Sequence, residues 1–252
     1  MINLNEKVVL VTGGSRGIGA ATVRALAEAG AEVVLHFNAA REQAEALSAE
    51  IGPERCHLVQ ADLAEPGAVA GLWREALAQV PRIDVLVNNA GVFDAVSVND
   101  PEDAWRETWQ RVLQINLIAA ADLCREAIGS FRSQGGGKII NIASRAAFRG
   151  EVPEQMPYGA SKGALITLTK TIARGFAAEG ILAFAIAPGF TETDMVAANV
   201  DPRTLSTVIA DIPLGEIADP REIGALVAFL ASDHARHLTG ATFDVNGASY
   251  VR

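Results

Sequence analysis

The amino-terminal stretch is the sequence feature that most narrows the folds available to this chain. Val8–Val11 is an uninterrupted apolar run, which is typical of a parallel strand covered on both faces. Residues 12–19 contain four glycines, and apolar residues such as Val23 and Leu26 then recur at helical spacing. Glycines at a strand-to-helix turn let a pyrophosphate approach the amides at the helix N-terminus. This stretch predicts a phosphate cradle, and a tight turn that binds nothing is the alternative.

The rest of the chain repeats this alternation of strand and helix. Further strands are expected at residues 32–37, 56–60, 83–87, 138–142 and 181–187, and further helices at 40–51, 101–131, about 157–176 and 223–230. The 252 residues, half of them hydrophobic, suit one large α/β domain with a substantial core. We therefore expect a single domain over residues 1–252.

The end of the second expected strand bears on the choice of cofactor. It carries Phe37 and Asn38, where an Asp or Glu would bond the 2′-hydroxyl of an NAD ribose. Arg16 in the glycine turn, and Arg41 beyond the strand, offer positive charge to a 2′-phosphate. The pattern favours NADP(H) and leaves NAD(H) possible. The alternative is that both arginines are solvated surface charges.

Two further strand ends carry small or polar residues. Asp62 and Leu63 follow the third strand, and Asp62 suits either the adenine amino group or the cap of the next helix. Asn88, Asn89, Ala90 and Gly91 follow the fourth strand. Their small size and amide groups allow a cofactor close to the backbone.

Tyr158 and Lys162 are four residues apart at the head of a segment with helical periodicity, so they share one helix face. An ammonium group one turn away favours the phenolate and is expected to lower the tyrosine pKa from about 10. Such a tyrosine is suited to general acid–base catalysis. Taken alone, the pair is also compatible with an ordinary amphipathic helix.

With these motifs together, the chain resembles the short-chain dehydrogenase/reductase family, in particular its group of 3-oxoacyl-carrier-protein reductases. Thr12, Gly13, Gly17 and Gly19 match the T-G-x-x-x-G-x-G turn of the family, and residues 88–91 match its N-N-A-G motif. The resemblance covers nearly the whole chain. It implies a single Rossmann-like domain with a doubly wound parallel sheet.

The resemblance also implies the site residues. Its catalytic set maps onto Asn116, Ser144, Tyr158 and Lys162. Ser144 would hold a carbonyl oxygen, although a hydrogen bond to the local backbone is the common alternative for serine. Besides Tyr158 and Lys162, the expected cofactor contacts are Gly13, Ser15, Arg16, Gly17, Ile18, Gly19, Asn38, Asp62, Leu63, Asn89, Ala90, Gly91, Pro188, Gly189 and Thr191. No metal is expected.

Departures from the family pattern occur in three places. The interval from Ser144 to Tyr158 is about one residue longer than usual, and Leu182 and Phe184 replace a common arginine and asparagine. Asn246-Gly247-Ala248 stands where relatives often have Asp-Gly-Gly. Residues 191–213 mix polar and apolar character, as suits a substrate lid or, alternatively, a fixed helical hairpin.

The predicted function is hydride transfer between NADP(H) and a carbonyl or secondary alcohol of a small or medium organic substrate. The alternatives are a catalytically silent NADP(H) sensor or scaffold and, less favoured, a nucleotide-sugar epimerase or dehydratase. Acyl-carrier protein is not the expected carrier, because neutral residues 135–137 and acidic Glu179 stand where docking arginines are expected near the entrance.

Charge and hydropathy bound the remaining partners. A net charge of −9 disfavours nucleic acid. No apolar run reaches membrane-spanning length, and the first residues lack a basic region followed by an apolar one, so a soluble cytoplasmic protein is expected. Cys56 and Cys124 are expected to be buried and reduced. The family resemblance implies a homotetramer or dimer.

Overall fold

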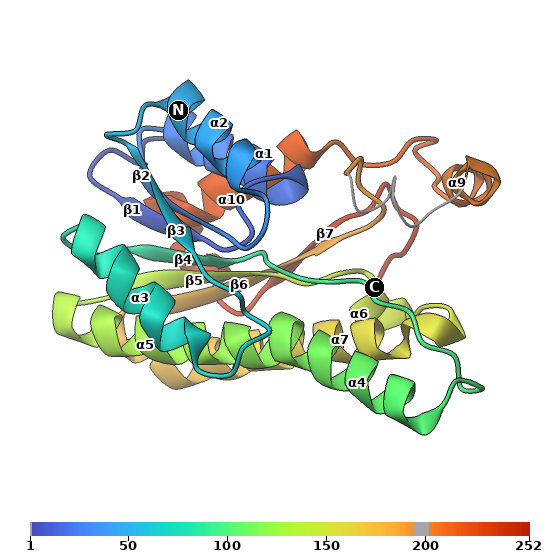
Figure 1. Ribbon diagram of the computed structural model, residues 1–252. Helices are drawn as coiled ribbons and strands as arrows, with labels where there is room; N and C mark the ends of the chain where they lie inside the picture. The colour runs from blue at the N-terminus through green and yellow to red at the C-terminus, as the bar shows by residue number, and fades with distance from the viewer. Residues whose placement is uncertain (1, 194–201) are drawn as a thin grey trace.

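The computed structural model describes residues 2–193 and 202–252 and contains one seven-stranded parallel sheet with the order β3-β2-β1-β4-β5-β6-β7 (Figure 1). The strands are β1 Val8–Val11, β2 Glu32–Phe37, β3 Cys56–Gln60, β4 Val85–Asn88, β5 Gly137–Ile142, β6 Ile181–Pro188 and β7 Thr242–Val245. The order reverses between β1 and β4, which places a crevice at the carboxyl ends of these strands. The predicted doubly wound, Rossmann-like sheet is confirmed.

Helices cover both faces of the sheet (Figure 1). Their bounds are α1 Gly17–Glu28, α2 Arg41–Ile51, α3 Ala68–Gln79, α4 Glu102–Leu113, α5 Ala119–Gln134, α6 Ala146–Arg149, α7 Met156–Phe176, α9 Pro202–Ala210 and α10 Pro220–Ala231. Val9 and Val11 of β1 pack into the core under α1, α2 and α10, whereas Val8 and Leu10 pack into the core over α3, α5 and α7. This alternation explains why the strands are apolar without interruption.

Most expected elements are present, with three differences. The helical region expected at 101–131 is divided by a π-helical turn at Gln114–Ile118. The fourth strand begins at Val85 rather than Ile83, because the preceding Asp84 carboxylate accepts a hydrogen bond from the Val8 amide at 2.9 Å. β7 was not expected, and it pairs with β6 along Ala185 to Pro188.

The departures from the family pattern have simple structural accounts. Leu182 and Phe184 are buried in the core on the α10 side of the sheet, so apolar packing replaces the polar side chains of relatives. Ala248 adopts a left-handed conformation with φ of 65°, a region that favours glycine.

Cys56 and Cys124 are free and buried, and burial raises the pKa of the two thiols to about 11 and about 12.

Two expectations are only partly addressed. The predicted lid at about 191–213 includes residues 194–201, which lie outside the described residues, and α9 accounts for Pro202–Ala210 (Figure 1). Among the helices that the structure describes, none combines the length and the apolar character needed to cross a membrane.

Candidate active site

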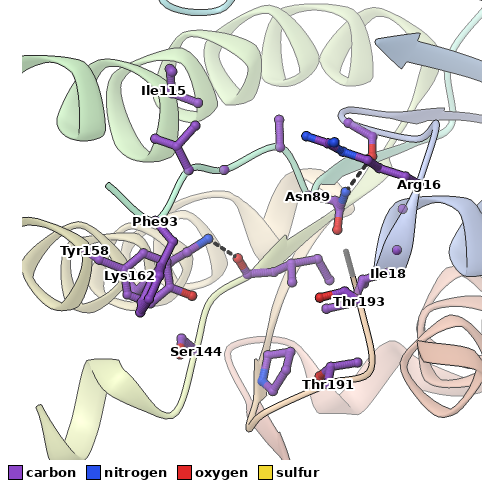
Figure 2. A pocket seen from close by; sticks show the side chains of 18 of the residues that line it. Arg16, Ile18, Asn89, Phe93, Ile115, Ser144, Tyr158, Lys162, Thr191 and Thr193 are labelled. Atoms are coloured by element: carbon purple, nitrogen blue, oxygen red, sulfur yellow. Dashed lines mark hydrogen bonds between the residues drawn. The ribbon is translucent and has the colours of Figure 1, made fainter. Parts of the chain in front are cut away.

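A cavity of about 700 Å³ lies at the carboxyl ends of β1, β2, β4, β5 and β6. Figure 2 shows Arg16, Ile18 and Asn89 toward one end and Tyr158, Lys162 and Ser144 toward the other. Every residue expected to contact the cofactor lines this cavity, as do three of the four expected catalytic residues. The expected residues on its wall are Gly13, Ser15, Arg16, Gly17, Ile18, Gly19, Asn38, Asp62, Leu63, Asn89, Ala90, Gly91, Ser144, Tyr158, Lys162, Pro188, Gly189 and Thr191.

The glycine turn has the close backbone packing that a phosphate cradle needs. Gly13 and Gly17 have φ of 62° and 53°, which favours glycine at both positions. A Cβ on Gly19 would lie 2.0 Å from the Gly13 carbonyl oxygen and 2.7 Å from Asn89 Nδ2. The turn leads directly into α1, whose first amides have no carbonyl partner within the helix. These features fit a dinucleotide pyrophosphate.

Thr12 and Asn89 hold the glycine turn against the segment after β4. Thr12 Oγ1 accepts hydrogen bonds from the amides of Asn89 and Ala90, both at 3.0 Å. Asn89 Nδ2 donates to the carbonyls of Thr12 at 2.9 Å and Gly13 at 3.0 Å. The turn and the segment therefore form one rigid floor beneath the cavity.

His36 also supports this floor, and the sequence analysis did not identify it. Its ring is buried between the Gly13 amide, 3.1 Å from Nδ1, and the Ala61 carbonyl, 3.1 Å from Nε2. A carbonyl only accepts, so Nε2 carries the proton and Nδ1 accepts from Gly13. Burial lowers the pKa of His36 to about 4. The ring is thus neutral at physiological pH and keeps both bonds.

The two arginines considered for the 2′-phosphate have different environments. Arg16 is exposed on the cavity wall, at the residue before α1. Arg41 does not line the cavity, because its guanidinium bonds Gln60 and Glu45 and lies 5.4 Å from the centroid of the Phe37 ring. Of the two arginines, Arg16 is therefore the one that lies on the cavity wall.

Asp62 lines the cavity and also accepts a hydrogen bond from the Ala64 amide at 2.9 Å. It does not cap the next helix, because α3 begins at Ala68 after Gly67. The capping interpretation of Asp62 is therefore wrong, and its carboxylate closes a local turn on the cavity wall.

Ser144, Tyr158 and Lys162 come together from two elements. Ser144 follows β5, whereas Tyr158 and Lys162 lie in the first turns of α7. Ser144 Oγ accepts from the Ala146 amide at 3.1 Å, so the backbone contact considered for it does occur. It also lies close enough to the Tyr158 hydroxyl to influence the pKa of that group. The short helix α6 lies between Ser144 and Tyr158, in the interval that is about one residue longer than is usual for the family.

The pKa of Tyr158 differs from the sequence-based expectation. Burial raises it to about 12, the neighbouring Ser144 hydroxyl partly offsets this, and the charge of Glu151 adds to the increase. Lys162 Nζ donates to the Ile142 carbonyl at 2.8 Å and lies 5.7 Å from the centroid of the Tyr158 ring (Figure 2). Burial lowers the pKa of Lys162 to about 8. The predicted lowering of the tyrosine pKa is therefore wrong for this arrangement, and Tyr158 keeps its proton at neutral pH.

Asn116 lies behind the cavity wall rather than on it. The π-helical turn directs its side chain to Val92, whose amide donates to Asn116 Oδ1 at 2.8 Å and whose carbonyl accepts from Nδ2 at 3.0 Å. A Cβ on Gly91 would lie 3.3 Å from Asn116 Oδ1 and 3.4 Å from Lys162 Nζ. Gly91 thus keeps the space between these two groups open.

The substrate end of the cavity has a wall that sequence reasoning missed. Phe93 packs edge-to-face against Tyr158, with ring centroids 4.7 Å apart. Arg111 pairs with Asp94 at 2.9 Å. The further lining residues without an earlier assignment are His36, Ala39, Ala40, Gln43, Val92, Phe93, Arg111, Ile115, Ile142, Ala143, Arg145, Glu151, Phe190 and Thr193. Most of them lie within two positions of a predicted site residue, which is the sequence signal that could have pointed to them.

Residues 135–137 and Glu179 do not lie beside the active-site cavity of their own chain. Residues 135–137 lead into the start of β5 and line a smaller cavity with Lys7 and Arg82, at the amino-terminal edge of the sheet. This edge lies at the end of the sheet opposite the active-site cavity of the same chain. The expected position of residues 135–137 and Glu179 beside the entrance is therefore wrong within one chain, because α5 runs antiparallel to the strands and ends away from the site.

Together, the parallel sheet, the glycine turn and the Ser–Tyr–Lys cluster define a Rossmann-like oxidoreductase. A family model described as enoyl-(acyl carrier protein) reductase matches residues 13–248. The 3-oxoacyl-[acyl-carrier-protein] reductase of Synechocystis is 40% identical over 98% of both chains, and that of Vibrio cholerae is 35% identical over 99% of this chain and 100% of the relative. The chain belongs to the short-chain dehydrogenase/reductase family.

Solved structures are similar over the same length. A metagenomic blue fluorescent protein in complex with NADPH has a TM-score of 0.90 and 37% identity, covering 99% of this chain and 100% of that one. A putative NAD(P)-dependent gluconate 5-dehydrogenase from Beutenbergia cavernae, with bound NADP, has a TM-score of 0.91 and 33% identity over 98% of both chains.

Proposed function

We propose that the chain is an NADP(H)-dependent reductase of a carbonyl group on a small or medium organic substrate, reversibly a dehydrogenase of the corresponding alcohol. The observation that carries this proposal is the convergence of Ser144, Tyr158 and Lys162 at one end of a cavity whose other end is the glycine turn. A silent sensor would need the cradle but not the cluster of proton-transfer groups.

The lining residues divide by the part of the cofactor they suit. The amides after Gly13 suit the pyrophosphate, Arg16 a 2′-phosphate, and Asp62 with Leu63 the adenine side. Pro188, Gly189 and Thr191 at the end of β6 suit the nicotinamide side. When bound, the reduced nicotinamide supplies the hydride.

The proton side of the reaction follows from the cluster itself. Ser144 Oγ, fixed by the Ala146 amide, is placed to donate to a carbonyl oxygen. Tyr158, protonated at neutral pH, delivers its proton to the same oxygen as the alcohol forms. Lys162 Nζ and Asn116 Oδ1 both face the open space beside Gly91, which suits a path for reprotonation.

Arg16→Ala is expected to narrow the preference for NADPH over NADH. A charge-assisted contact to the 2′-phosphate contributes roughly 1.5–3 kcal/mol, equivalent to about a tenfold to hundredfold preference. Fluorescence titration of both cofactors measures the two dissociation constants. Arg41→Ala is the matched control, because Arg41 bonds Gln60 and Glu45 outside the cavity. Equal affinities of the unmodified protein for the two cofactors would contradict the prediction.

A free substrate is expected to be reduced at least as efficiently as one carried by acyl-carrier protein. The chain has a net charge of −9, and two arginines around the entrance are paired, Arg111 with Asp94 and Arg149 with Asp211. An acidic carrier therefore meets little unpaired positive charge there. The test compares kcat/KM for one 3-oxoacyl group as the carrier-protein thioester and as a small thioester. A large advantage of the carrier form that fades with added salt would refute this.

The reductase activity is tested directly by NADPH oxidation with a panel of small ketones, aldehydes and thioesters, read at substrate saturation. If none of these compounds is reduced, the result favours the alternative of a catalytically silent NADP(H) sensor. We further propose a homotetramer or dimer, which light scattering of the purified protein distinguishes from a monomer.

A further inference from the structure

Arg145 is a buried cation on the wall of the active-site cavity that nothing in the proposed chemistry uses. It directly follows Ser144, and its amide donates to the Pro188 carbonyl at 2.9 Å, which fixes its backbone at the ends of β5 and β6. Only 3% of the residue is exposed. Ser144 and Lys162 are comparably buried, at 7% and 4%, and both face the same cavity. Such burial does not prevent contact with a bound substrate.

The guanidinium of Arg145 is only partly satisfied. One Nη donates to Ser249 Oγ, and the group lies 5.0 Å from the centroid of the Phe190 ring, which also lines the cavity. Ser249 Oγ in turn donates to the Asn246 carbonyl at 2.8 Å. A guanidinium has five N–H donors. Within residues 2–193 and 202–252, the remaining donors of Arg145 have no acceptor.

Within the described residues Arg145 forms no ion pair, although the Glu151 and Asp211 carboxylates are close enough to act on its charge. The carboxylate that approaches its helix, Asp211, pairs with Arg149 at 3.5 Å, and Glu151 forms no ion pair with Arg145 in the described part of the chain. A buried charge without a partner is costly. The cavity wall carries four cationic and two acidic side chains, although the chain as a whole is acidic.

We propose that Arg145 is a specificity-determining residue that binds a carboxylate of the substrate, so that this reductase acts on small oxo acids and the matching hydroxy acids. The inference rests on the proposed reductase function. A planar carboxylate matches the free edge of a guanidinium already held by Ser249 and Phe190. A phosphate dianion fits less well, because Glu151 lines the same wall.

The experiment measures kcat/KM for pairs of substrates that differ only in charge: 4-oxopentanoate and 5-oxohexanoate against their carboxamides, with dihydroxyacetone phosphate as the phosphate arm. Intact protein is expected to prefer each acid by roughly tenfold to a hundredfold. In Arg145→Gln the ratio of kcat/KM for acid over amide is expected to fall to about one, and in Arg145→Lys part of the preference for the acid is expected to remain. Arg149→Gln, the matched control at the end of the short helix that follows Arg145, keeps this ratio. Because the ratio compares two substrates on one preparation, partial misfolding of a variant does not alter it.

Three results overturn the inference: equal efficiency for acids and amides in the intact protein, an unchanged ratio in Arg145→Gln, or a higher kcat/KM for the phosphate than for the acids. Calorimetric titration of pentanoate and pentanamide separates this inference from the function. If pentanoate binds more tightly than pentanamide only when Arg145 is present, and no carbonyl compound is reduced, then the reductase function fails and the carboxylate site stands. If the amides are reduced and pentanoate has no advantage, the function stands and the carboxylate site fails.

Discussion

Tyr158→Phe is expected to lower turnover at least roughly a hundredfold while NADPH binds with nearly unchanged affinity. The change removes only the hydroxyl, which lies near Ser144 and holds the proton that the substrate oxygen receives. The ring remains, so its edge-to-face contact with Phe93 is kept. Steady-state kinetics and fluorescence titration of NADPH measure the two quantities on the same preparation.

The role assigned to Tyr158 would be wrong if the variant kept a tenth or more of the original rate. Loss of NADPH binding together with activity would also argue against it, since that result means that the hydroxyl supports the cavity rather than the reaction. A melting curve that matches the unmodified protein excludes general unfolding as the cause.

Gly19→Ala is expected to abolish measurable NADPH binding, with at least a hundredfold increase in the dissociation constant. The added Cβ would lie 2.0 Å from the Gly13 carbonyl oxygen and 2.9 Å from its carbonyl carbon, so the backbone of the turn itself has to move. The cradle for the pyrophosphate is then lost. Titration with NADPH and thermal unfolding, measured side by side, give the size of each effect.

Gly71→Ala is the matched control for this variant. Gly71 lies inside α3, away from the cavity, and a Cβ there meets nothing within 4 Å. Because glycine is a poor helix former, the alanine is expected to stabilise the fold by up to about 1 kcal/mol and to leave NADPH binding unchanged. If Gly19→Ala bound NADPH as tightly as Gly71→Ala does, the glycine turn would not be the cofactor site.

Local spacing explains what could be predicted from the sequence. Gly13 to Gly19 follow one strand and open one helix, and Tyr158 and Lys162 lie one turn apart on α7, so short-range pattern alone determines their relation. The alternating cores on the two faces of the sheet follow in the same way from the apolar strands.

The features that could not be predicted depend on contacts between distant segments. His36 meets Gly13 and Ala61 across two strand pairings. Arg145 meets Ser249, more than a hundred positions later in the chain. Neither spacing nor composition carries such information. The pKa of Tyr158 belongs to the same group, because it depends on burial and on where the ammonium group of Lys162 points.

The π-helical turn at Gln114–Ile118 imposes a constraint on chain length. Val112 is buried on α4 and Leu123 on α5, while Asn116 faces Val92 between them. Each residue added to or removed from a helix rotates the later part of that helix by about 100°. Deleting one residue here would make a more regular helix but would turn one of these three side chains out of its contact. Substitutions in this segment that keep Asn116 are therefore open to evolution and to engineering, whereas single insertions and deletions are not.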